Sequence, residues 1–522
     1  MHTVQLSGLE ARTDIRHRLL QPRREWINTW ILRVLVAAGC LALGTFFSWW
    51  FVNGRLHSPW MWLWLILAVF YAGTQMVGNW ILYLLARREV TPAPPGAALK
   101  VDVFVTACRE PYEMIERSLT AACALRGAHR TWLLDDGSDP GLTALTERLG
   151  AGYLTRPMHQ NAKAGNLNAA LSRTEGEIIA IFDIDHVPEP GFLEKSLGYF
   201  SDPRIGFVQV MLTFDNSDES WVARAAMETS LEFYNPTYLG TAGVGGASMM
   251  GSNALIRRSA LEAIGGYRAG LAEDLATSIA LHAAGWKSAY VAEPLAPGQA
   301  PPSFTAWFVQ QLKWARGVFE LLLTSYPRLF PKLTWGQRLS YAVRMTKYWI
   351  GPVVGMHLFA TVAVLIFADA PFRDAFHDYL IYLSPLVGCD VLIRYIALQT
   401  WKHPSIARTS LTRAVSLVYA TWPIYMVAWL MAVLRLPLPF RPTPKGLERR
   451  TSNPIWLLPQ GLALALLTAG ILYTIFVSGH QPSILVVFAI LQGILQLALL
   501  YQWLNLEMKT MKTKQHYGDC SS

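Results

Sequence analysis

Long apolar stretches lie near both ends of the chain, and one long polar block separates them. A membrane-spanning helix needs about 20 mostly apolar residues. The pattern predicts six such spans, at 28–51, 59–85, 345–368, 379–400, 455–478 and 482–504. Residues 411–435 are also apolar enough to span, and here we expect an interfacial helix on the cytosolic surface instead. Residues 98–340 have the composition of a water-soluble domain.

Basic residues flank the predicted spans on one side. Arg23 and Arg24 precede the first span and Arg87 and Arg88 follow the second, whereas the loop after the third span is acidic. By the positive-inside rule, we expect a multi-pass protein of the plasma (bacterial inner) membrane with both termini and the polar block in the cytosol. These flanks account for the formal net charge of +9, so nucleic acid is not an expected partner.

This pattern divides the chain into four regions. Residues 1–97 are expected to form an N-terminal cytosolic segment and two transmembrane helices, and 98–340 a cytosolic domain. Residues 341–504 are expected to contain the interfacial helix, a loop and about four transmembrane helices, and 505–522 a short basic cytosolic tail. The five scattered cysteines have no CxxC spacing, so neither a disulfide framework nor a zinc site is expected. We expect no cleavable signal peptide, because the first 25 residues lack an apolar core.

Within the polar block, short β-rich runs alternate with helical periodicity. The predicted strands are Val101–Thr106, Thr131–Leu134, Ile178–Phe182, Phe207–Val210 and Ala289–Val291, and the predicted helices are 113–125, 164–172 and 273–284. This alternation predicts an α/β domain with a mostly parallel sheet. Ligands of such sheets bind beyond the carboxyl ends of the strands.

Asp183, Asp185 and His186 follow directly on one apolar predicted strand. An unpaired carboxylate at the end of a buried strand is costly, so these acids need a partner. Oxygen ligands suit Mg²⁺ or Mn²⁺, and a histidine nitrogen shifts the preference toward Mn²⁺. The alternative for His186 is a capping or packing role.

Two further acidic pairs have a chemical and a structural interpretation. Asp135 and Asp136 also follow a predicted strand, where they could bind a nucleoside, but the same residues are common in surface turns. Glu273 and Asp274 begin a predicted helix, where acidic residues favour the helix dipole. In the chemical interpretation, one of these two carboxylates is a general base that deprotonates an acceptor hydroxyl.

Gln310, Lys313 and Trp314 share one face of a predicted helix, because they are spaced at i, i+3 and i+4. They could bind a pyrophosphate and stack on a sugar, or form an amphipathic face with a lysine reaching to solvent. Lys163 is another candidate contact for a phosphate or nucleobase.

In this order, these motifs resemble the processive family 2 glycosyltransferases, in particular the cellulose synthase-like members. The resemblance covers about 98–450 and includes Asp135–Gly137, the string 182–188, Glu273–Asp274, Gln310–Trp314, 333–338, and Phe440, Thr443 and Lys445. It implies a GT-A type cytosolic α/β domain inserted in an α-helical polytopic membrane domain.

The resemblance also implies site roles. Asp135, Asp136 and Lys163 would hold UDP, with Gln310 and Lys313 on its pyrophosphate. Asp183, Asp185 and His186 would serve Mg²⁺ or Mn²⁺. Asp274 beside Glu273 would be the catalytic base, and Trp314 would bind the acceptor. Phe440, Thr443 and Lys445 would belong to a gating loop.

The partners implied by the resemblance are a UDP-sugar donor, with UDP-glucose favoured, a growing polysaccharide acceptor, the lipid bilayer and an accessory export subunit. The expected activity is inverting, processive β-glucan synthesis, cellulose or a related glucan, with export of the chain. The alternatives are a non-processive transfer of one sugar to a lipid or oligosaccharide, and a non-catalytic transporter or scaffold.

Three positions depart from the family pattern. Lys313 replaces the arginine of Q-x-x-R-W, Ala272 replaces the threonine of T-E-D, and Ser248-Met249-Met250-Gly251 replaces Phe-Phe-Cys-Gly. A lysine keeps the charge but loses the bidentate geometry of arginine. We therefore expect that the substrate or linkage can differ from cellulose. We also expect no cyclic-di-GMP-binding barrel, because about 18 residues follow the last predicted span.

Overall fold

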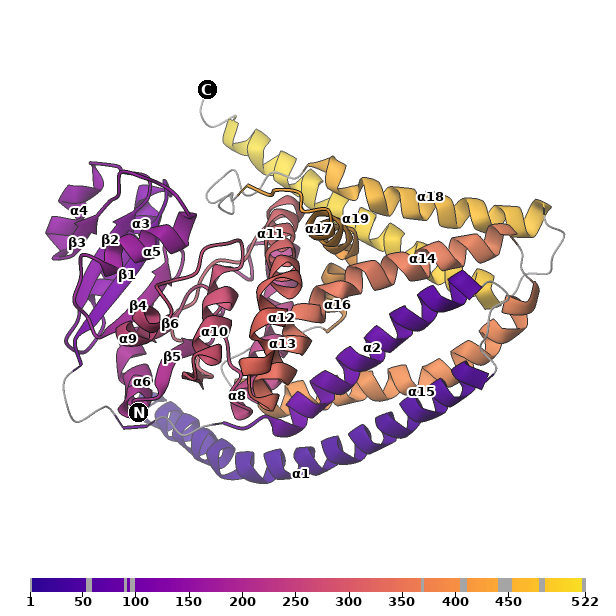
Figure 1. Ribbon diagram of the computed structural model, residues 1–522, viewed down its shortest axis with the longest axis horizontal. Helices are drawn as coiled ribbons and strands as arrows, with labels where there is room; N and C mark the ends of the chain where they lie inside the picture. The colour runs from indigo at the N-terminus through magenta and orange to yellow at the C-terminus, as the bar shows by residue number, and fades with distance from the viewer. Residues whose placement is uncertain are drawn as a thin grey trace.

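The computed structural model is elongated, with the polar block at one end and long apolar helices at the other (Figure 1). It describes residues 2–52, 59–88, 92–93, 99–367, 370–403, 411–439, 453–477 and 484–518. The expected gating-loop residues Phe440, Thr443 and Lys445 lie outside these described residues.

The polar block folds around one mixed seven-stranded sheet. Its strands are β1 (Val101–Ala107), β2 (Arg130–Asp135), β3 (Gly152–Leu154), β4 (Ile178–Asp183), β5 (Ile205–Val210), β6 (Ala254–Arg257) and β7 (Lys287–Val291). Their order across the sheet is β3-β2-β1-β4-β6-β5-β7. β6 pairs antiparallel with both of its neighbours, and the other pairs are parallel. The expected α/β domain with a mostly parallel sheet is therefore confirmed.

The central strands are apolar on both faces because both faces are covered. In β1, Val103 and Val105 pack into one core, and Phe104 packs into another on the opposite face. A strand buried on both sides has a continuous apolar run, which explains why these strands were predicted from the sequence. The sequence did not predict β3 and β6, which have only three and four residues.

Helices cover this sheet and connect its strands. In the polar block they are α3 (Tyr112–Cys123), α4 (Leu142–Leu149), α5 (Ala162–Leu171), α6 (Phe192–Ser196), η1 (Leu197–Ser201), α7 (Trp221–Glu232), η2 (Phe233–Thr237), α8 (Tyr238–Gly243), α9 (Arg258–Ala263) and α10 (Glu273–Ala283). η2 is one turn of π-helix that joins α7 to α8.

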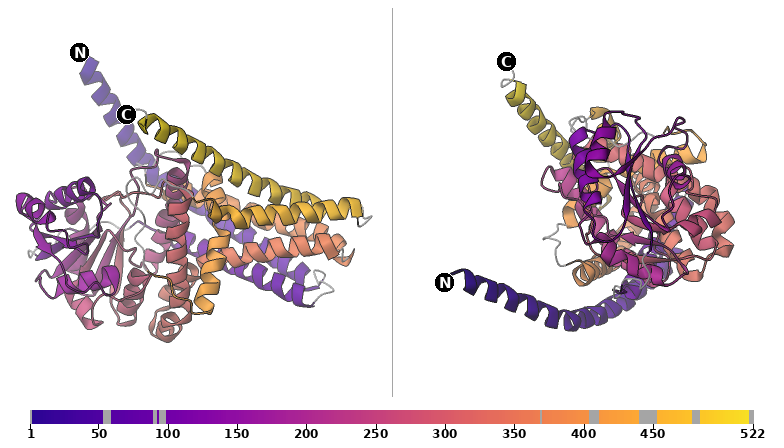
Figure 2. Two further views of the ribbon diagram at one scale, coloured as in Figure 1. Left: turned by 90° about the horizontal axis from the view of Figure 1, so that it is seen from above. Right: turned by 90° about the vertical axis from the view of Figure 1, so that its left-hand side faces the viewer.

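The remaining helices lie before and after the sheet domain in the chain. They are α1 (His2–Val52), α2 (Pro59–Leu85), α11 (Phe304–Leu323), α12 (Ser325–Leu329), η3 (Phe330–Lys332), α13 (Trp335–Thr346), η4 (Lys347–Trp349), α14 (Ile350–Phe367), α15 (Ala370–Trp401), α16 (Leu411–Ala420), α17 (Trp422–Val433), η6 (Pro454–Leu457), α18 (Leu458–Leu472), η7 (Tyr473–Val477) and α19 (Ile484–Gly518). In both Figure 1 and Figure 2, α14, α18 and α19 extend together away from the sheet.

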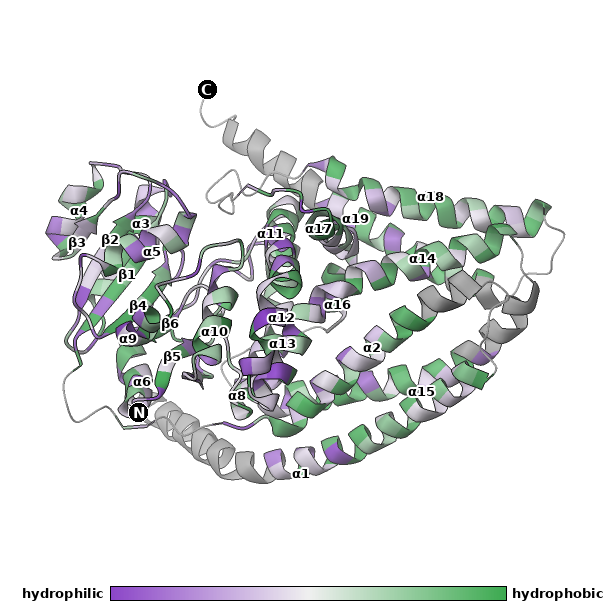
Figure 3. Cartoon of the chain, viewed as in Figure 1, coloured by the Kyte–Doolittle hydropathy of each residue, from purple (hydrophilic) through white to green (hydrophobic). Residues whose placement is uncertain are grey.

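Among the described residues, four helical segments are long and apolar enough to cross a membrane. They are Glu25–Val52, Trp335–Phe367, Leu380–Trp401 and Pro454–Val477. In Figure 3, green and white predominate along α14 and α18, whereas helices around the sheet such as α4 and α5 mix green and purple. A bent pair, Thr412–Ala420 and Trp422–Val433, adds a fifth if it counts as one span. A multi-pass membrane protein is thus supported, while the count of six spans stays a prediction.

The segment expected to form an interfacial helix at 411–435 is two helices, α16 and α17, with a bend of 41° between them. α11 packs against α17, where Trp307 Nε1 donates a hydrogen bond of 2.8 Å to Thr421 Oγ1. Tyr425 of α17 donates another, of 2.8 Å, to Gln311 Oε1. The second helix of this bent segment therefore packs against α11. The interfacial position of 411–435 on the cytosolic surface stays a prediction.

Candidate active site

Two of the predicted acidic groups lie together at one edge of the sheet. In the parallel pairing of β1 with β2, Ala107 lies beside Asp135, and in its pairing with β4, Thr106 lies beside Asp183. The carboxyl ends of three neighbouring strands thus bring Asp135–Asp136 and Asp183–His186 together, as expected for ligand binding in an α/β sheet.

Asp183, Asp185 and His186 form a compact group whose ligand atoms all lie within 4.8 Å of one another. His186 is only 7% exposed, and neither of its ring nitrogens has a hydrogen-bond partner among the described residues. Its Nδ1 lies 3.5 Å from Asp185 Oδ1. A buried imidazole without hydrogen bonds is costly unless a ligand completes it. The group therefore fits a divalent ion with oxygen and nitrogen ligands.

Gly298 makes room for this imidazole. A Cβ atom at position 298 would lie 2.6 Å from His186 Nε2, closer than any side chain allows. The backbone beside Gly298 is fixed by its own bonds, because its amide donates to the Thr213 carbonyl at 2.8 Å. The histidine is therefore held against a bare stretch of backbone beside the two carboxylates.

The two acids after β2 have different surroundings. Asp135 is 1% exposed and accepts hydrogen bonds from the amides of Gly137 and Asp139, both at 2.7 Å, and from the Tyr153 hydroxyl at 2.8 Å. Asp136, in contrast, lines the cavity. Asp135 thus shapes the turn, and Asp136 is the one of the pair that faces a ligand.

Asp136 is held ionised by its neighbours. Arg156 donates to its two oxygens at 2.6 and 2.8 Å, and His159 Nδ1 lies 2.9 Å from its Oδ1. Burial alone would raise the pKa of Asp136, but these hydrogen bonds outweigh it and lower the pKa below its usual range. Sequence reasoning missed both Arg156 and His159, because neither belongs to a patterned element.

Lys163 lies in the first turn of α5 and reaches the metal-binding group. Its Nζ donates to Asp183 Oδ1 and, at 2.8 Å, to the Gly251 carbonyl. Asp183 also accepts a 3.2 Å hydrogen bond from Thr106 Oγ1, and its amide donates to Ser252 Oγ at 3.0 Å. Lys163 therefore supplies a positive charge beside the expected metal and phosphate position. Thr106 and Ser252 are further site residues that the sequence did not reveal.

Glu273 and Asp274 begin α10 and line the same cavity. Burial, followed by the charge of Asp274, raises the pKa of Glu273 to about 7. Burial also raises the pKa of Asp274, against the opposing charge of Arg344. Two like charges in one buried place titrate as a pair, and a raised pKa suits a general base near neutral pH. The N-terminus of α10 accounts for part of this placement, because acids there also favour the helix dipole.

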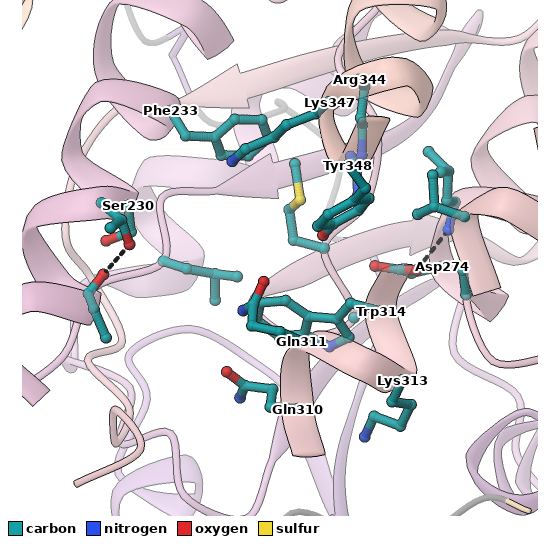
Figure 4. A pocket seen from close by; sticks show the side chains of 18 of the residues that line it. Ser230, Phe233, Asp274, Gln310, Gln311, Lys313, Trp314, Arg344, Lys347 and Tyr348 are labelled. Carbon is teal, nitrogen blue, oxygen red and sulfur yellow. Dashed lines mark hydrogen bonds between the residues drawn. The ribbon is translucent and has the colours of Figure 1, made fainter. Parts of the chain in front are cut away.

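The expected face of α11 points into the cavity (Figure 4). Gln310, Lys313 and Trp314 all line it, and the Trp314 side chain is 41% exposed. Gln311, one position along, also lines the cavity but is buried, and its Oε1 accepts a hydrogen bond from Tyr425 of α17. Beyond Trp314, the cavity wall includes Phe233, Arg344, Lys347 and Tyr348, which the sequence analysis did not select.

One continuous cavity of about 1640 Å³ connects all of these groups. It runs from Asp136 and Asp183 past Asp274 and Trp314 to polar residues on the long helices. Those at the far end are Tyr71, Gln75 and Asn79 of α2, Glu232 of α7, and Asp390 and Arg394 of α15. The arrangement can therefore hold a phosphorylated ligand at the sheet edge and an extended polar one beyond it.

Two of the three departures from the family pattern lie in packed surroundings. Ala272 precedes α10, where it makes no side-chain capping bond, and it packs in an apolar core. Met249 is fully buried in the core beneath the sheet, and the Met250 amide donates 2.8 Å to Gln209 Oε1. Lys313, the third, lines the cavity, and so do Ala272, Ser248 and Met250 of the other two departures.

Comparisons with known proteins agree with this site. The profile of a family described as "Glycosyltransferase like family 2" matches residues 97–317. The cellulose synthase catalytic subunit [UDP-forming] of Pseudomonas fluorescens is 33% identical over 333 residues, or 62% of this chain and 45% of that protein. Cellulose synthase 1 of Komagataeibacter xylinus is 33% identical over 54% of this chain and 19% of that protein. The chain thus spans less than half the length of these curated relatives.

Among solved structures, a mannosyltransferase from Pyrobaculum calidifontis in complex with GDP-Man and Mn²⁺ has a TM-score of 0.48, with 16% sequence identity over 65% of this chain and 97% of that one. The sheet domain has the expected GT-A-like α/β fold, flanked by long apolar helices that could cross a membrane. With its acidic group Asp183–Asp185 at the edge of that sheet, the chain belongs to glycosyltransferase family 2.

Proposed function

We propose that this protein is an inverting, processive β-glycosyltransferase that polymerises glucose from UDP-glucose and passes the growing chain through the membrane. The cellulose synthase relatives support the donor and product class. The observation that carries the proposal is the single cavity, which joins the sheet edge, Asp274 and the polar faces of α2 and α15.

In the proposed donor site, Asp136 and Lys163 hold the two ends of UDP. Asp136 is ionised and faces the cavity, which suits hydrogen bonds from ribose hydroxyls or the uracil imide. Lys163, Gln310 and Lys313 bring charge and hydrogen bonds to the diphosphate. Asp183, Asp185 and His186 would hold Mg²⁺ or Mn²⁺, which neutralises negative charge on the diphosphate when bound.

In the proposed reaction, Asp274 takes the proton from an acceptor hydroxyl. The hydroxyl oxygen forms a bond to the anomeric carbon of glucose, with inversion, as the bond from that carbon to the β-phosphate oxygen breaks. The electrons of the broken bond remain on the departing UDP, near the positive charges of Lys163 and Lys313. Glu273, with its raised pKa, retains a proton near neutral pH and so limits repulsion beside Asp274.

In the proposed acceptor site, Trp314 offers the terminal sugar an apolar face beside Asp274. An aromatic ring presents a large and rigid contact area. It can therefore orient a sugar ring without holding the chain at one point along its path. The catalytic domain is proposed to face the cytosol of the plasma membrane, where a UDP-sugar is available.

The test is UDP release by the full-length protein in lipid nanodiscs, measured with a panel of UDP-sugars and Mn²⁺ or Mg²⁺. We expect metal-dependent turnover of UDP-glucose and a polymer that linkage-specific glucanases digest. A product one sugar longer than the acceptor would overturn processivity and support the single-transfer alternative. No turnover of any UDP-sugar, in protein that is folded and monodisperse, would overturn the proposed function.

A further inference from the structure

Arg156 lies between β3 and α5 and is the most heavily bonded side chain at the donor edge. Its side chain is 6% exposed. Nε and Nη2 donate to the two oxygens of Asp136 at 2.6 and 2.8 Å. Nη1 donates to the Gln160 carbonyl at 2.6 Å, and Nη2 also donates to the Ala162 carbonyl at 2.9 Å. A guanidinium has five N–H donors in a fixed plane, so it can hold a carboxylate and two carbonyls at once.

The loop that Arg156 contacts has two successive non-glycine residues in the left-handed backbone region. Asn161 and Ala162 have φ angles of +60° and +43°. A non-glycine residue rarely adopts positive φ, and for alanine no side-chain hydrogen bond compensates. Such conformations persist only where the surroundings impose them. Arg156 donates to the carbonyls on both sides of Asn161, and the Gly165 amide donates to the Asn161 carbonyl at 3.1 Å, so Arg156 supplies two of the contacts that hold this conformation.

This loop sets the position of Lys163. Lys163 follows Ala162 directly, and its Nζ contacts Asp183 and the Gly251 carbonyl. Asp136 stands at the other end of the donor site, after β2. Arg156 thus contacts the carboxylate at one end of the site and the backbone that carries the cation at the other.

The backbone at Gly165 is packed too closely against this arrangement to allow a side chain. A Cβ atom on Gly165 would lie 2.1 Å from the Gln160 carbonyl oxygen and 2.4 Å from Arg156 Nη1. The first turn of α5 is therefore packed closely against Arg156 and the Gln160 carbonyl.

We propose that Arg156 is a positioning residue that fixes the distance between Asp136 and Lys163, so that both ends of one nucleoside diphosphate are bound together. This inference rests on the proposed function, because it takes UDP as the ligand. Arg156 does not itself line the cavity, so it acts through its two partners.

The direct test is Arg156→Lys in the full-length protein in nanodiscs, with UDP affinity measured by calorimetry in the presence of Mn²⁺. A lysine keeps the charge but cannot make four directed hydrogen bonds. We expect UDP affinity to fall at least tenfold and the KM for UDP-glucose to rise by a similar factor, with kcat changed less than threefold. The matched control is Arg173→Lys, since Arg173 is exposed and donates 2.8 Å to the carbonyl of Thr155, the residue before Arg156. The control should stay within twofold of the wild type.

A second variant keeps the proposal testable if Arg156→Lys does not fold. Gly165→Ala removes no charge and no hydrogen bond, but its methyl group must displace Arg156 Nη1 or the Gln160 carbonyl. We expect the same rise in KM. A folded Arg156→Lys or Gly165→Ala protein with UDP affinity and KM within twofold of the wild type would overturn the proposal.

A double-variant cycle separates positioning from general stability. Lys163→Met should weaken UDP binding strongly in the wild-type background and much less in the Arg156→Lys background, because Arg156 acts partly through Lys163. Fully additive losses would overturn the proposal. If the wild-type protein binds no UDP, the proposed function itself is overturned. If the wild type and the variants bind UDP equally well, only the positioning role of Arg156 is overturned.

Discussion

The two ends of the cavity, one at the sheet edge and one between α2, α7 and α15, differ in how their polar groups are satisfied. At the sheet edge, Asp136 is paired with Arg156 and Asp183 with Lys163, but the buried His186 ring nitrogens make no hydrogen bond to a described residue. At the other end, the Glu232 carboxylate accepts from Tyr83 at 2.6 Å and pairs with Arg394. Asp390 accepts from Trp80 at 2.8 Å and from Arg394 at 2.7 Å. The sheet edge therefore keeps a buried imidazole that a ligand can complete, whereas the carboxylates at the other end are paired.

This difference suits two kinds of contact. A donor that is bound, split and released once per cycle benefits from groups whose hydrogen bonds only the ligand completes. A chain that must move past a surface benefits from groups that are already satisfied, because each step then breaks few strong bonds. The contrast supports the proposed processive mechanism and predicts that substitutions at the two ends affect different measurements.

The largest effect is expected where the two ends meet, at Asp274. Asp274→Asn removes the proposed base but keeps the size of the side chain, and general-base catalysis typically contributes about 10²–10⁴-fold. We expect kcat to fall about 10³-fold while UDP affinity changes less than threefold. Single-turnover kinetics and calorimetry on the same nanodisc sample measure both. Glu262→Gln, on the exposed surface of α9, is the matched control. An Asp274→Asn protein with near wild-type turnover would return the base role to Glu273 or another group.

The next largest effect is expected from Arg394→Met, which leaves Glu232 and Asp390 without their shared cation. The Arg394 and Glu232 side chains are each 29% exposed, so removing one partner should cost less than the ~3–5 kcal/mol of a fully buried pair. We therefore expect a clear loss of thermal stability in nanodiscs and shorter products, but unchanged UDP affinity. The control is Arg204→Met, because Arg204 forms an exposed pair with Asp202 at 2.9 Å, and such pairs contribute about 0–1 kcal/mol. Loss of UDP affinity in Arg394→Met would show that the two ends are not independent.

How far the sequence predicted each end follows from the same contrast. Asp183–His186 and Asp136 lie within a few residues of apolar strands that are buried on both faces, so pattern alone located them. The Asp390–Arg394 pair was visible as charges in an apolar stretch. Its partners Trp80, Tyr83 and Glu232 lie 162 to 311 residues away from it in the sequence, and only the tertiary fold brings them together.

Arg156 shows the same limit at the sheet edge. It follows β3, a strand of three residues, which is too short to leave a periodic pattern. Its function depends on the positive φ angles of Asn161 and Ala162, and alanine gives no sequence signal for that conformation. Asp135 was predicted as a nucleotide contact together with Asp136; the structure engages Asp135 in three hydrogen bonds of the turn, and its direct contact with UDP stays a prediction.

A smaller effect is expected from pH, through the pair Glu273 and Asp274. Burial raises the pKa of both carboxyls, so the base Asp274 takes up its proton at a higher pH than an ordinary aspartate does. The sign is a loss of kcat/KM on the acid side, about tenfold per pH unit once Asp274 is protonated. The pH dependence of kcat/KM between 5 and 8 measures it. Glu273→Gln keeps the neighbour neutral, as protonated Glu273 is on the acid side, so the acid limb should stay where Asp274 places it. A wild-type rate that is flat down to pH 5 would contradict the pairing.

The smallest effect is expected from Lys313→Arg, which restores the arginine of the family pattern at the donor end. Arginine offers two parallel donors to a phosphate, whereas lysine acts as a point charge, so the diphosphate should be held more tightly by about 1 kcal/mol or less. We expect UDP to bind about threefold more tightly, with product length unchanged. Calorimetry with UDP and sizing of the products measure the two ends separately. The charge of Lys313 lowers the pKa of Glu273, and the substitution keeps that charge, so the acid limb of the pH profile should stay in place. Weaker binding of UDP would show that the cavity is shaped for the narrower ammonium, and that the lysine is a specificity feature of this chain.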